Sequence, residues 1–285
     1  METLFYWPRS LNEAVALMNR SDGAVIVNGG SDIILEIAAK KKSPAAIVYI
    51  AGIEGMDTIT DDGECVRIGG CVTYRQMQRS PVCRRMTGLM ESIRNLGSPP
   101  IRAIATPAGN IATAAPSADC ATMMLALGAE LVLVSADGER VVPQKDIYVS
   151  AYKTSIHENE IIRELRFPSP GKGEGSGYYR LARRKAQDIA KVLVGTVVRL
   201  DDSGRCIDAA VSLGALNATI VSSPVTEELI RGMNKEEAFQ AAENHFPPEA
   251  GLRESYFKHY KELTTGAAVA RSLAMAYDEA LGRIQ

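Results

Sequence analysis

The sequence has few of the residues that build metal centres. Its 285 residues include five cysteines and three histidines, and no two cysteines are spaced C-x-x-C. Zinc and iron–sulphur sites need several such ligands close together, so we predict reduced structural thiols and no metal site. The sequence also lacks a Ser-His-Asp or Cys-His pattern, and we therefore assign no catalytic nucleophile or general base.

The chain also has no basic surplus and no long apolar run. Its formal net charge is −2, which argues against a general attraction to nucleic acid or anionic lipid. No apolar run approaches the length that spans a bilayer, and the first residues lack a basic start followed by an apolar core. With 46% hydrophobic and 23% charged residues, we expect a globular cytoplasmic protein of two lobes.

The first hundred residues alternate between strand and helix patterns. Apolar residues at helical spacing precede a buried-looking run, and a second helical pattern follows it. This order of strand, helix and strand is typical of an α/β start. We predict strands over 24–27, 45–50 and 66–70, and helices over 11–18, 31–39, 73–78 and 85–95.

The rest of the chain predicts a second lobe of different character. The run Gly171–Gly177 has the clearest linker composition and is the predicted boundary between lobes over 1–170 and 178–285, with a hinge or surface loop as the alternative. The predicted fold class is α+β: an α/β-type N-terminal lobe with two subdomains and a C-terminal lobe of antiparallel sheet and helices. The predicted elements are a helix over 121–127, a hairpin of 130–134 with 140–142, strands over 189–200 and 207–216, and helices over 226–232, 235–243 and 265–281.

The segment Val27-Asn28-Gly29-Gly30-Ser31-Asp32 joins an apolar run to a helical pattern. A strand that turns through two glycines into a helix leaves the first helical N–H groups unpaired, and the helix dipole favours an anion there. The glycines let backbone approach a phosphate closely, and Ser31 can cap the helix or donate its hydroxyl. The segment predicts an anion site or, alternatively, a plain strand-to-helix turn with a serine cap. It matches neither the Rossmann fingerprint nor the P-loop.

A second glycine-containing segment lies among small residues over 103–121. Its hydroxyl and amide side chains could hydrogen-bond phosphates and hydroxyls of a ligand, and Asp119 could accept from a ribityl chain. The alternative is a buried alanine-rich packing segment with Asp119 as a helix N-cap. Two such loops in one lobe suit a pyrophosphate better than a single phosphate. The candidate side chains are Thr106, Asn110, Thr113 and Ser117.

Several segments occur in a characteristic order. Gly29–Asp32 is followed by Ile101–Thr106 with Gly109–Ala112, then by Pro116–Asp119, and later by Tyr179–Ala190 and Leu252–Ala270. In order and spacing these segments resemble the FAD-binding subunit of molybdenum hydroxylases. That family includes the flavin subunits of bacterial xanthine dehydrogenases and the medium subunit of carbon monoxide dehydrogenase. The resemblance covers almost the whole chain.

The resemblance implies FAD as the cofactor. In the family, the first glycine loop and a T-x-G-G-N loop hold the FAD pyrophosphate, while a later Asp and an Arg-rich segment lie nearer the flavin ring. Arg183, Arg184 and Lys185 could lie near the flavin or face a partner subunit, with a solvated charge run as the alternative. The Asp188 carboxylate could cap a strand edge instead of contacting the cofactor. The implied cofactor-binding residues are Val27, Asn28, Gly29, Gly30, Ser31, Asp32, Thr106, Gly109, Asn110, Thr113, Ser117, Asp119, Ile162, Lys185 and Asp188.

The same resemblance implies an electron-transfer role. Electrons from molybdenum would pass through iron–sulphur clusters on another chain to FAD, then to NAD or another acceptor. The implied partners are an iron–sulphur subunit and a molybdopterin subunit. Two alternatives stay open: a self-contained flavin oxidoreductase of the same fold superfamily, and a cofactor-free interaction subunit.

One position departs from the family motif. The chain reads Thr106-Pro107-Ala108-Gly109-Asn110 where the family usually has Thr-x-Gly-Gly-Asn. If Ala108 adopted a positive φ, the strain relative to glycine would be about 1 kcal/mol. Two outcomes stay open, weakened FAD binding and lost FAD binding, and restoring glycine at Ala108 and measuring the flavin affinity would separate them.

Overall fold

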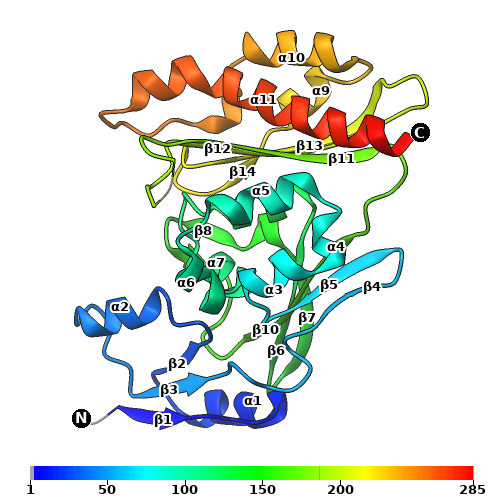
Figure 1. Cartoon of the computed structure of the whole chain (residues 1–285). Coiled ribbons are helices and arrows are strands. Elements are labelled where there is room, and N and C mark those ends of the chain that lie inside the picture. The colour runs from blue at the N-terminus through cyan, green and yellow to red at the C-terminus, as the bar shows by residue number, and fades with distance from the viewer. Residues whose placement is uncertain (1–2, 186, 285) are drawn as a thin grey trace.

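The computed structural model describes residues 3–185 and 187–284. Figure 1 shows a stack of layers, with a small α/β unit near the N-terminus, helices around an antiparallel sheet in the middle, and a helix-covered sheet near the C-terminus. This arrangement confirms the predicted α+β fold class. No helix in the described ranges is both long enough and apolar enough to cross a membrane.

The first subdomain is built on a three-stranded parallel sheet. Its strand order is β1-β3-β2, so the predicted strand–helix–strand unit gains an N-terminal strand that the sequence patterns did not reveal. Helix α2 begins two residues later than predicted, because residues 31–32 form a turn. The elements are β1 (Leu4–Tyr6), α1 (Leu11–Arg20), β2 (Ala24–Val27), α2 (Ile33–Ala38) and β3 (Ala46–Tyr49).

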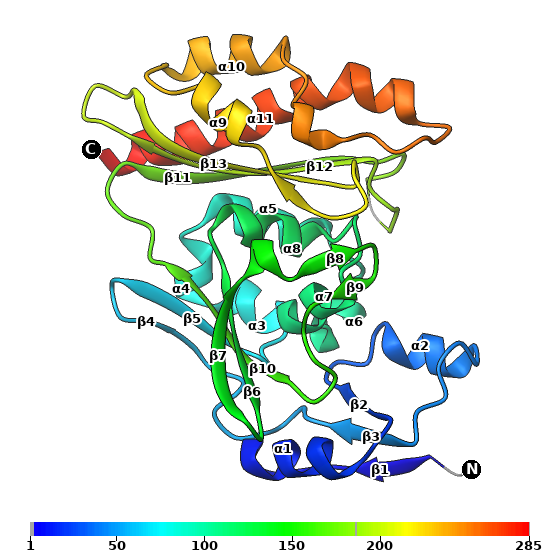
Figure 2. The ribbon, with the colours of Figure 1, turned by 180° about the vertical axis from the view of Figure 1, so that it is seen from behind.

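The second subdomain packs six helices against a five-stranded antiparallel sheet, whose long strands are clearest from behind (Figure 2). The sheet order is β4-β5-β10-β6-β7, and all its pairs are antiparallel. Its strands are β4 (Ile59–Asp61), β5 (Cys65–Gly69), β6 (Glu130–Ser135), β7 (Gly138–Pro143) and β10 (Ile161–Pro168), with β8 (Tyr148–Ser150) and β9 (Lys153–Thr154) as a separate hairpin. Its helices are α3 (Tyr74–Arg79), α4 (Pro81–Arg84), α5 (Thr87–Asn95), α6 (Pro99–Ile104), α7 (Pro107–Thr113) and α8 (Asp119–Ala126), with a short 3-10 turn at Gln144–Asp146.

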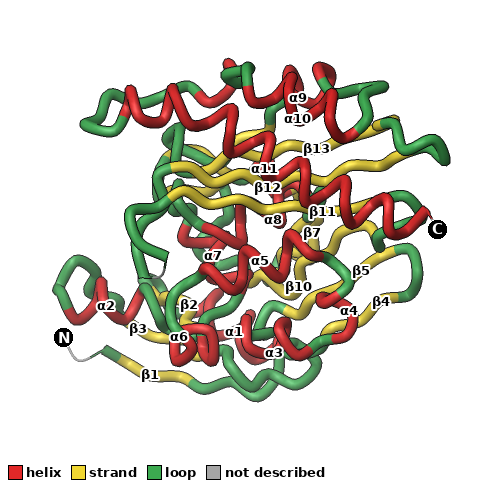
Figure 3. Tube along the Cα trace, turned by 45° about the horizontal axis from the view of Figure 1, so that its top comes forward, coloured by secondary structure: helices red, strands yellow, loops and turns green. Residues whose placement is uncertain are grey.

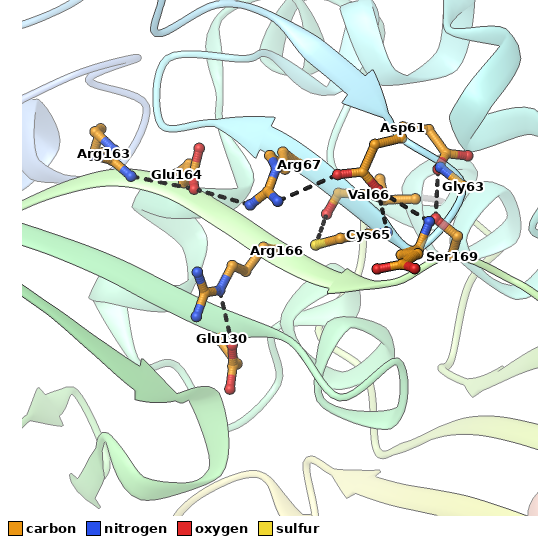
Figure 4. A network of polar contacts seen from close by, with 12 residues as sticks. Asp61, Gly63, Cys65, Val66, Arg67, Glu130, Arg163, Glu164, Arg166 and Ser169 are labelled. Carbon is orange, nitrogen blue, oxygen red and sulfur yellow. Dashed lines mark hydrogen bonds and ion pairs between the residues drawn. The ribbon is translucent and has the colours of Figure 1, made fainter.

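Ion pairs cross the partly exposed face of this sheet (Figure 4). Arg166 on β10 lies opposite Glu130 on β6, and its Nε is 2.9 Å from the Glu130 carboxylate. On the other side of β10, a guanidinium nitrogen of Arg67 on β5 lies 3.8 Å from the Glu164 carboxylate. Such partly exposed pairs each contribute up to about 1 kcal/mol, and they favour this strand register over a shifted one.

The C-terminal lobe is a four-stranded antiparallel sheet with the order β11-β12-β13-β14. The long helix α11 crosses its strands on the outer side (Figure 3), while α5 and α8 lie against the inner side (Figure 2). The lobe contains β11 (Glu174–Leu181), β12 (Val192–Leu200), β13 (Cys206–Gly214), β14 (Val221–Ser222), α9 (Pro224–Leu229), α10 (Lys235–Glu243), a 3-10 turn at Pro248–Ala250, and α11 (Lys258–Ile284).

The predicted linker is shorter than its composition indicated. Residues 171–173 lie outside regular structure, but Glu174 to Gly177 belong to β11, so reading the whole glycine run as a linker was wrong. Two of its glycines permit close contact with α11. A Cβ on Gly175 would lie 2.1 Å from the carbonyl oxygen of Ala276, and one on Gly177 would lie 1.9 Å from that of Ser272. Any side chain there would push the helix away from the sheet.

One carboxylate of α11 makes hydrogen bonds to both lobes. Glu279 accepts hydrogen bonds from the backbone N–H and hydroxyl of Thr87, at 2.8 and 2.9 Å, and from those of Ser176, at 2.7 and 2.8 Å. Thr87 is the first residue of α5, which has no side-chain cap from its own segment. Glu279 therefore caps a helix of the N-terminal lobe from the end of the chain.

Candidate functional site

The two glycine-containing loops meet, although they lie about eighty residues apart in sequence. The Asn28 side-chain amide donates to the carbonyl of Gly70 at 2.7 Å and contacts the Thr106 hydroxyl at 3.4 Å. Gly29 touches the end of α6, because a Cβ there would lie 2.0 Å from the carbonyl oxygen of Ile104. The absence of a side chain at Gly29 thus permits the contact that brings the loops together.

A cavity of about 460 Å³ opens between these loops. That volume lies within the range typical of small-molecule and cofactor sites. Most of the residues expected from the sequence line it, whereas Val27 is buried at the end of β2 and is not in the described lining. The expected residues that line the cavity are Asn28, Gly29, Gly30, Ser31, Asp32, Thr106, Gly109, Asn110, Thr113 and Ile162.

The first loop offers several backbone donors without partners. The N–H groups of Gly29, Gly30, Ser31 and Asp32 make no hydrogen bond to any residue in 3–185 or 187–284, although all four residues line the cavity. Gly30 has a φ of +66°, which glycine tolerates without strain. The alternative of a serine cap is wrong, since the N-cap position of α2 is Asp32 and its side chain makes no capping bond. Ser31 therefore keeps its hydroxyl available at the cavity.

The second loop is a helix start. Thr106 is the N-cap of α7, and its hydroxyl accepts from the backbone N–H of Gly109 at 3.1 Å. Pro107 occupies the first helical turn, where its fixed φ and missing N–H carry no penalty. Ala108 follows in the helix and is not among the residues of positive φ, so the predicted strain at Ala108 was wrong.

Replacing Ala108 with glycine is expected to lower stability without improving the cofactor site. The Ala108→Gly change removes a buried methyl group and places glycine within a helix, at a cost of about 1 kcal/mol. Urea unfolding should show this loss, and titration with FAD should show unchanged or weaker binding. Tighter binding by the glycine variant would mean that Ala108 strains the loop after all.

Two polar side chains of the second segment are used within the protein. The side-chain oxygen Oδ1 of Asn110 accepts a hydrogen bond from the backbone N–H of Ala121 at 3.2 Å, which connects α7 to α8. The Thr113 hydroxyl donates to the Asp32 carboxylate at 3.2 Å and so links α7 to the first loop. Both residues line the cavity, but part of their hydrogen-bonding capacity holds its walls together.

Ser117 and Asp119 lie outside the described lining of the cavity. Asp119 accepts from the Tyr178 hydroxyl at 2.7 Å and pairs with Arg180 at 3.0 Å, and it is not the N-cap of α8. Burial raises the pKa of Asp119 above its ordinary value, even though Tyr178 and Arg180 favour the charged form. In this structure Asp119 therefore links the two lobes.

Lys185 and Asp188 lie in the loop between β11 and β12, also outside the described lining. Lys185 is exposed. Asp188 accepts from the backbone N–H groups of Arg183 at 2.8 Å and Ile189 at 3.0 Å. Asp188 therefore organises its own loop; because Arg183 and Ile189 both lie outside β11 and β12, the strand-edge cap that the sequence left open is also wrong.

An ion pair between a buried carboxylate on the cavity wall and an exposed arginine was not identified from the sequence. Glu160 lines the cavity with 5% of its side chain exposed, and its carboxylate accepts from both Nε and an Nη of Arg140. Burial raises the pKa of Glu160, but the hydrogen bonds from Arg140 and from the backbone N–H of His157 outweigh it and hold the pKa below the ordinary value of 4.5. Glu160 is thus charged at neutral pH.

The pair with Arg140 gives a pH-dependent prediction. Because the pKa of Glu160 is lowered in the folded state, its contribution to stability is present above pH 4.5 and is lost as the pH falls below that value. Glu160→Gln should therefore lower the free energy of unfolding by about 1–3 kcal/mol at neutral pH and by less in acid. Urea unfolding of both proteins over this range measures the difference, and Glu158→Gln, at an exposed neighbour, is the matched control. A difference that stays constant with pH would contradict the prediction.

The sequence patterns do not predict that the remaining lining residues belong to the cavity. Most are aliphatic side chains that look like ordinary core positions, and Lys42 looks like a charge at a helix end. Lys42 lies 3.5 Å from Glu36, and both line the cavity. Only the packing of α2, α3, α6 and the hairpin around one space identifies them. They include Ile33, Glu36, Lys42, Tyr74, Leu96, Ile101, Tyr152, Ile156 and Glu160.

A cavity of this size with unpaired backbone donors on one wall is typical of a site for a small molecule or cofactor that carries a phosphate. Two family models match this chain. The FAD binding domain in molybdopterin dehydrogenase matches residues 1–170, and the CO dehydrogenase flavoprotein C-terminal domain matches residues 177–276.

Individual relatives agree with these models. The putative xanthine dehydrogenase FAD-binding subunit of Escherichia coli K12 is 31% identical over 68% of this chain and 67% of its own. The nicotinate dehydrogenase FAD-subunit of Eubacterium barkeri is 27% identical over 80% of this chain and 79% of its own. In structure, a chain of carbon monoxide dehydrogenase from Hydrogenophaga pseudoflava matches with a TM-score of 0.87 at 25% identity, over 98% of each chain.

The chain therefore belongs to the FAD-binding subunits of the molybdenum hydroxylase family, of the CO and xanthine dehydrogenase type. This confirms the resemblance seen in the sequence, and FAD is the cofactor. The donors present fit that group, since the N–H groups of residues 29–32 have no partner in the described residues and could bind a pyrophosphate, with no side chain on Gly29 or Gly30.

Proposed function

We propose that this chain is the electron-transfer flavoprotein of a heteromeric molybdenum hydroxylase. It would receive electrons from iron–sulphur clusters on one partner, which are supplied by a molybdopterin subunit, and pass them to NAD or another acceptor. When bound, FAD supplies this chemistry because it can accept electrons singly and release them in pairs. The observation that carries the proposal is the convergence of two remote loops on one cavity with unpaired N–H groups.

The residues of this chain would bind and position the cofactor. Gly29, Gly30 and Ser31 would hold the pyrophosphate through their backbone N–H groups, while Thr106 and Asn28 keep the two loops in contact. The other lining residues expected from the sequence, Asp32, Gly109, Asn110, Thr113 and Ile162, would surround it.

The multi-subunit assembly is supported by the relatives. Those named above are described as a FAD-binding subunit and a FAD-subunit, and other relatives are medium chains of carbon monoxide dehydrogenase. Substrate specificity would then lie on a different polypeptide.

Flavin and metal analysis of the complex from its native source tests the proposal. The purified complex should be yellow, release FAD on denaturation, and contain molybdenum and iron on co-purifying chains. Anaerobic addition of NADH should bleach the flavin absorbance if NAD is the acceptor, and no bleaching would assign the role to another acceptor. A colourless chain that does not bind added FAD would overturn the proposal in favour of a cofactor-free interaction subunit. Reduction of the flavin by a small substrate with no partner present would favour a self-contained oxidoreductase.

A further inference from the structure

The turn of the β8–β9 hairpin places an unusual tyrosine at the cavity. Tyr152 has a φ of +60°, a left-handed conformation that a bulky side chain adopts at a cost of order 1–2 kcal/mol. Glycine or asparagine would occupy such a turn position with less strain. The presence of tyrosine at this position requires a compensating reason.

The hairpin is held against the cavity wall by its backbone. The Tyr152 N–H donates to the carbonyl of Ala114 at 2.9 Å. Ala114 has a φ of +50° and ends α7, whose first residues form the second cofactor loop. The position of Tyr152 is therefore fixed relative to that loop, and the strain is stored in a defined geometry.

Among the described residues, no hydrogen bond, aromatic pair or cation–π pair of the Tyr152 side chain explains this strain. It is 70% exposed although it lines the cavity, whereas Tyr74, the other aromatic residue in the described lining, is fully buried. Within the described ranges its hydroxyl makes no hydrogen bond, and its ring joins no aromatic or cation–π pair. An exposed aromatic ring at a cavity mouth offers a flat apolar face to a planar ligand.

We propose that Tyr152 covers the isoalloxazine ring of bound FAD. This inference rests on the proposed function, and it names the cofactor ring that this residue contacts. The redox-active ring has to be reached by electrons from outside the chain, so it belongs at the cavity mouth, while the adenine ring can be enclosed. Tyr152 would then shield one face of the flavin from water and position the ring for transfer.

The tests use the full chain with FAD removed and added back. Tyr152→Ala should weaken FAD binding about five- to tenfold, as loss of one aromatic stacking contact predicts. It should also raise the fluorescence of bound FAD, because a stacked tyrosine quenches flavin emission. Tyr152→Phe keeps the ring and should bind FAD as the wild type does. Unchanged affinity and fluorescence in Tyr152→Ala, with FAD bound by the wild type, would overturn the inference and leave the proposed function intact.

Two further measurements separate stacking from a structural role. Tyr152→Gly relieves the strained φ, so the apo protein should melt at a higher temperature while FAD binds more weakly. A merely structural tyrosine would lower both together. FMN, which carries only the flavin end, should bind Tyr152→Ala more weakly, whereas ADP should bind both proteins equally. Weaker ADP binding with unchanged FMN binding would place the adenine under Tyr152 and contradict the inference.

Discussion

Gly177→Ala is expected to lower the free energy of unfolding by about 3 kcal/mol or more. The new Cβ would lie 1.9 Å from the carbonyl oxygen of Ser272 on α11 and 2.8 Å from the Thr196 hydroxyl. The first of these is a backbone atom in the middle of a long helix, so the clash cannot be relieved by turning a side chain. Urea unfolding followed by circular dichroism measures the change.

Gly171→Ala is the matched control for this experiment. It introduces the same methyl group into the same glycine-rich run, but nothing lies within 4 Å of the added Cβ. Its stability should equal or slightly exceed that of the wild type, because alanine restricts the unfolded chain. Equal midpoints for Gly177→Ala and Gly171→Ala would show that α11 does not pack on β11 as described.

Gly29→Ala is expected to weaken FAD binding about a hundredfold or more, which corresponds to about 2.7 kcal/mol. The added Cβ would lie 2.0 Å from the Ile104 carbonyl oxygen and 3.0 Å from the Ala105 Cα. The first loop would have to move away from α6, which would displace its free N–H groups relative to the second loop. Fluorescence titration of the apo protein with FAD measures the loss.

The apo protein should tolerate Gly29→Ala better than the FAD site does. The loop lies at the surface of the N-terminal subdomain, so a shift of the loop leaves the core clusters in place. Gly282→Ala, which meets open space, is the control that should bind FAD normally. Wild-type affinity in Gly29→Ala would exclude the described meeting of the two loops.

The local chemistry of the first loop could be predicted from the sequence. A buried strand, two glycines and a helical pattern predicted unpaired N–H groups in the first helical turn, whereas the structure has them at residues 29–32, in the turn before α2. The contact between Gly29 and Ile104 could not be predicted, because it depends on how two distant segments pack. Glu160 could not be predicted as a cavity residue for the same reason. Its partner Arg140 lies elsewhere in the sequence, and nothing in the residues next to Glu160 indicates that the two side chains pair.

Two predictions were wrong, the strain at Ala108 and the linker over Gly171–Gly177, because each relied on a family motif or on composition and not on the local backbone pattern. Ala108 was aligned with a glycine of the family motif and therefore expected at positive φ. Yet Thr106 followed by Pro107 is itself the signature of a helix start, which places Ala108 in ordinary helical backbone. The glycine run was interpreted as a linker, although Gly175 and Gly177 are two residues apart, the spacing of one face of a strand.

The capping of α5 by Glu279 bears on how the protein forms during translation. Thr87 and its acceptor are 192 residues apart, so the ribosome has made most of the polypeptide before this helix start receives its partner. The N-terminal lobe can collapse early, but its last contact arrives only with the final turns of α11. We expect a nascent chain to remain incompletely closed until it is released, and a prematurely terminated one to be a ready substrate for chaperones and proteases.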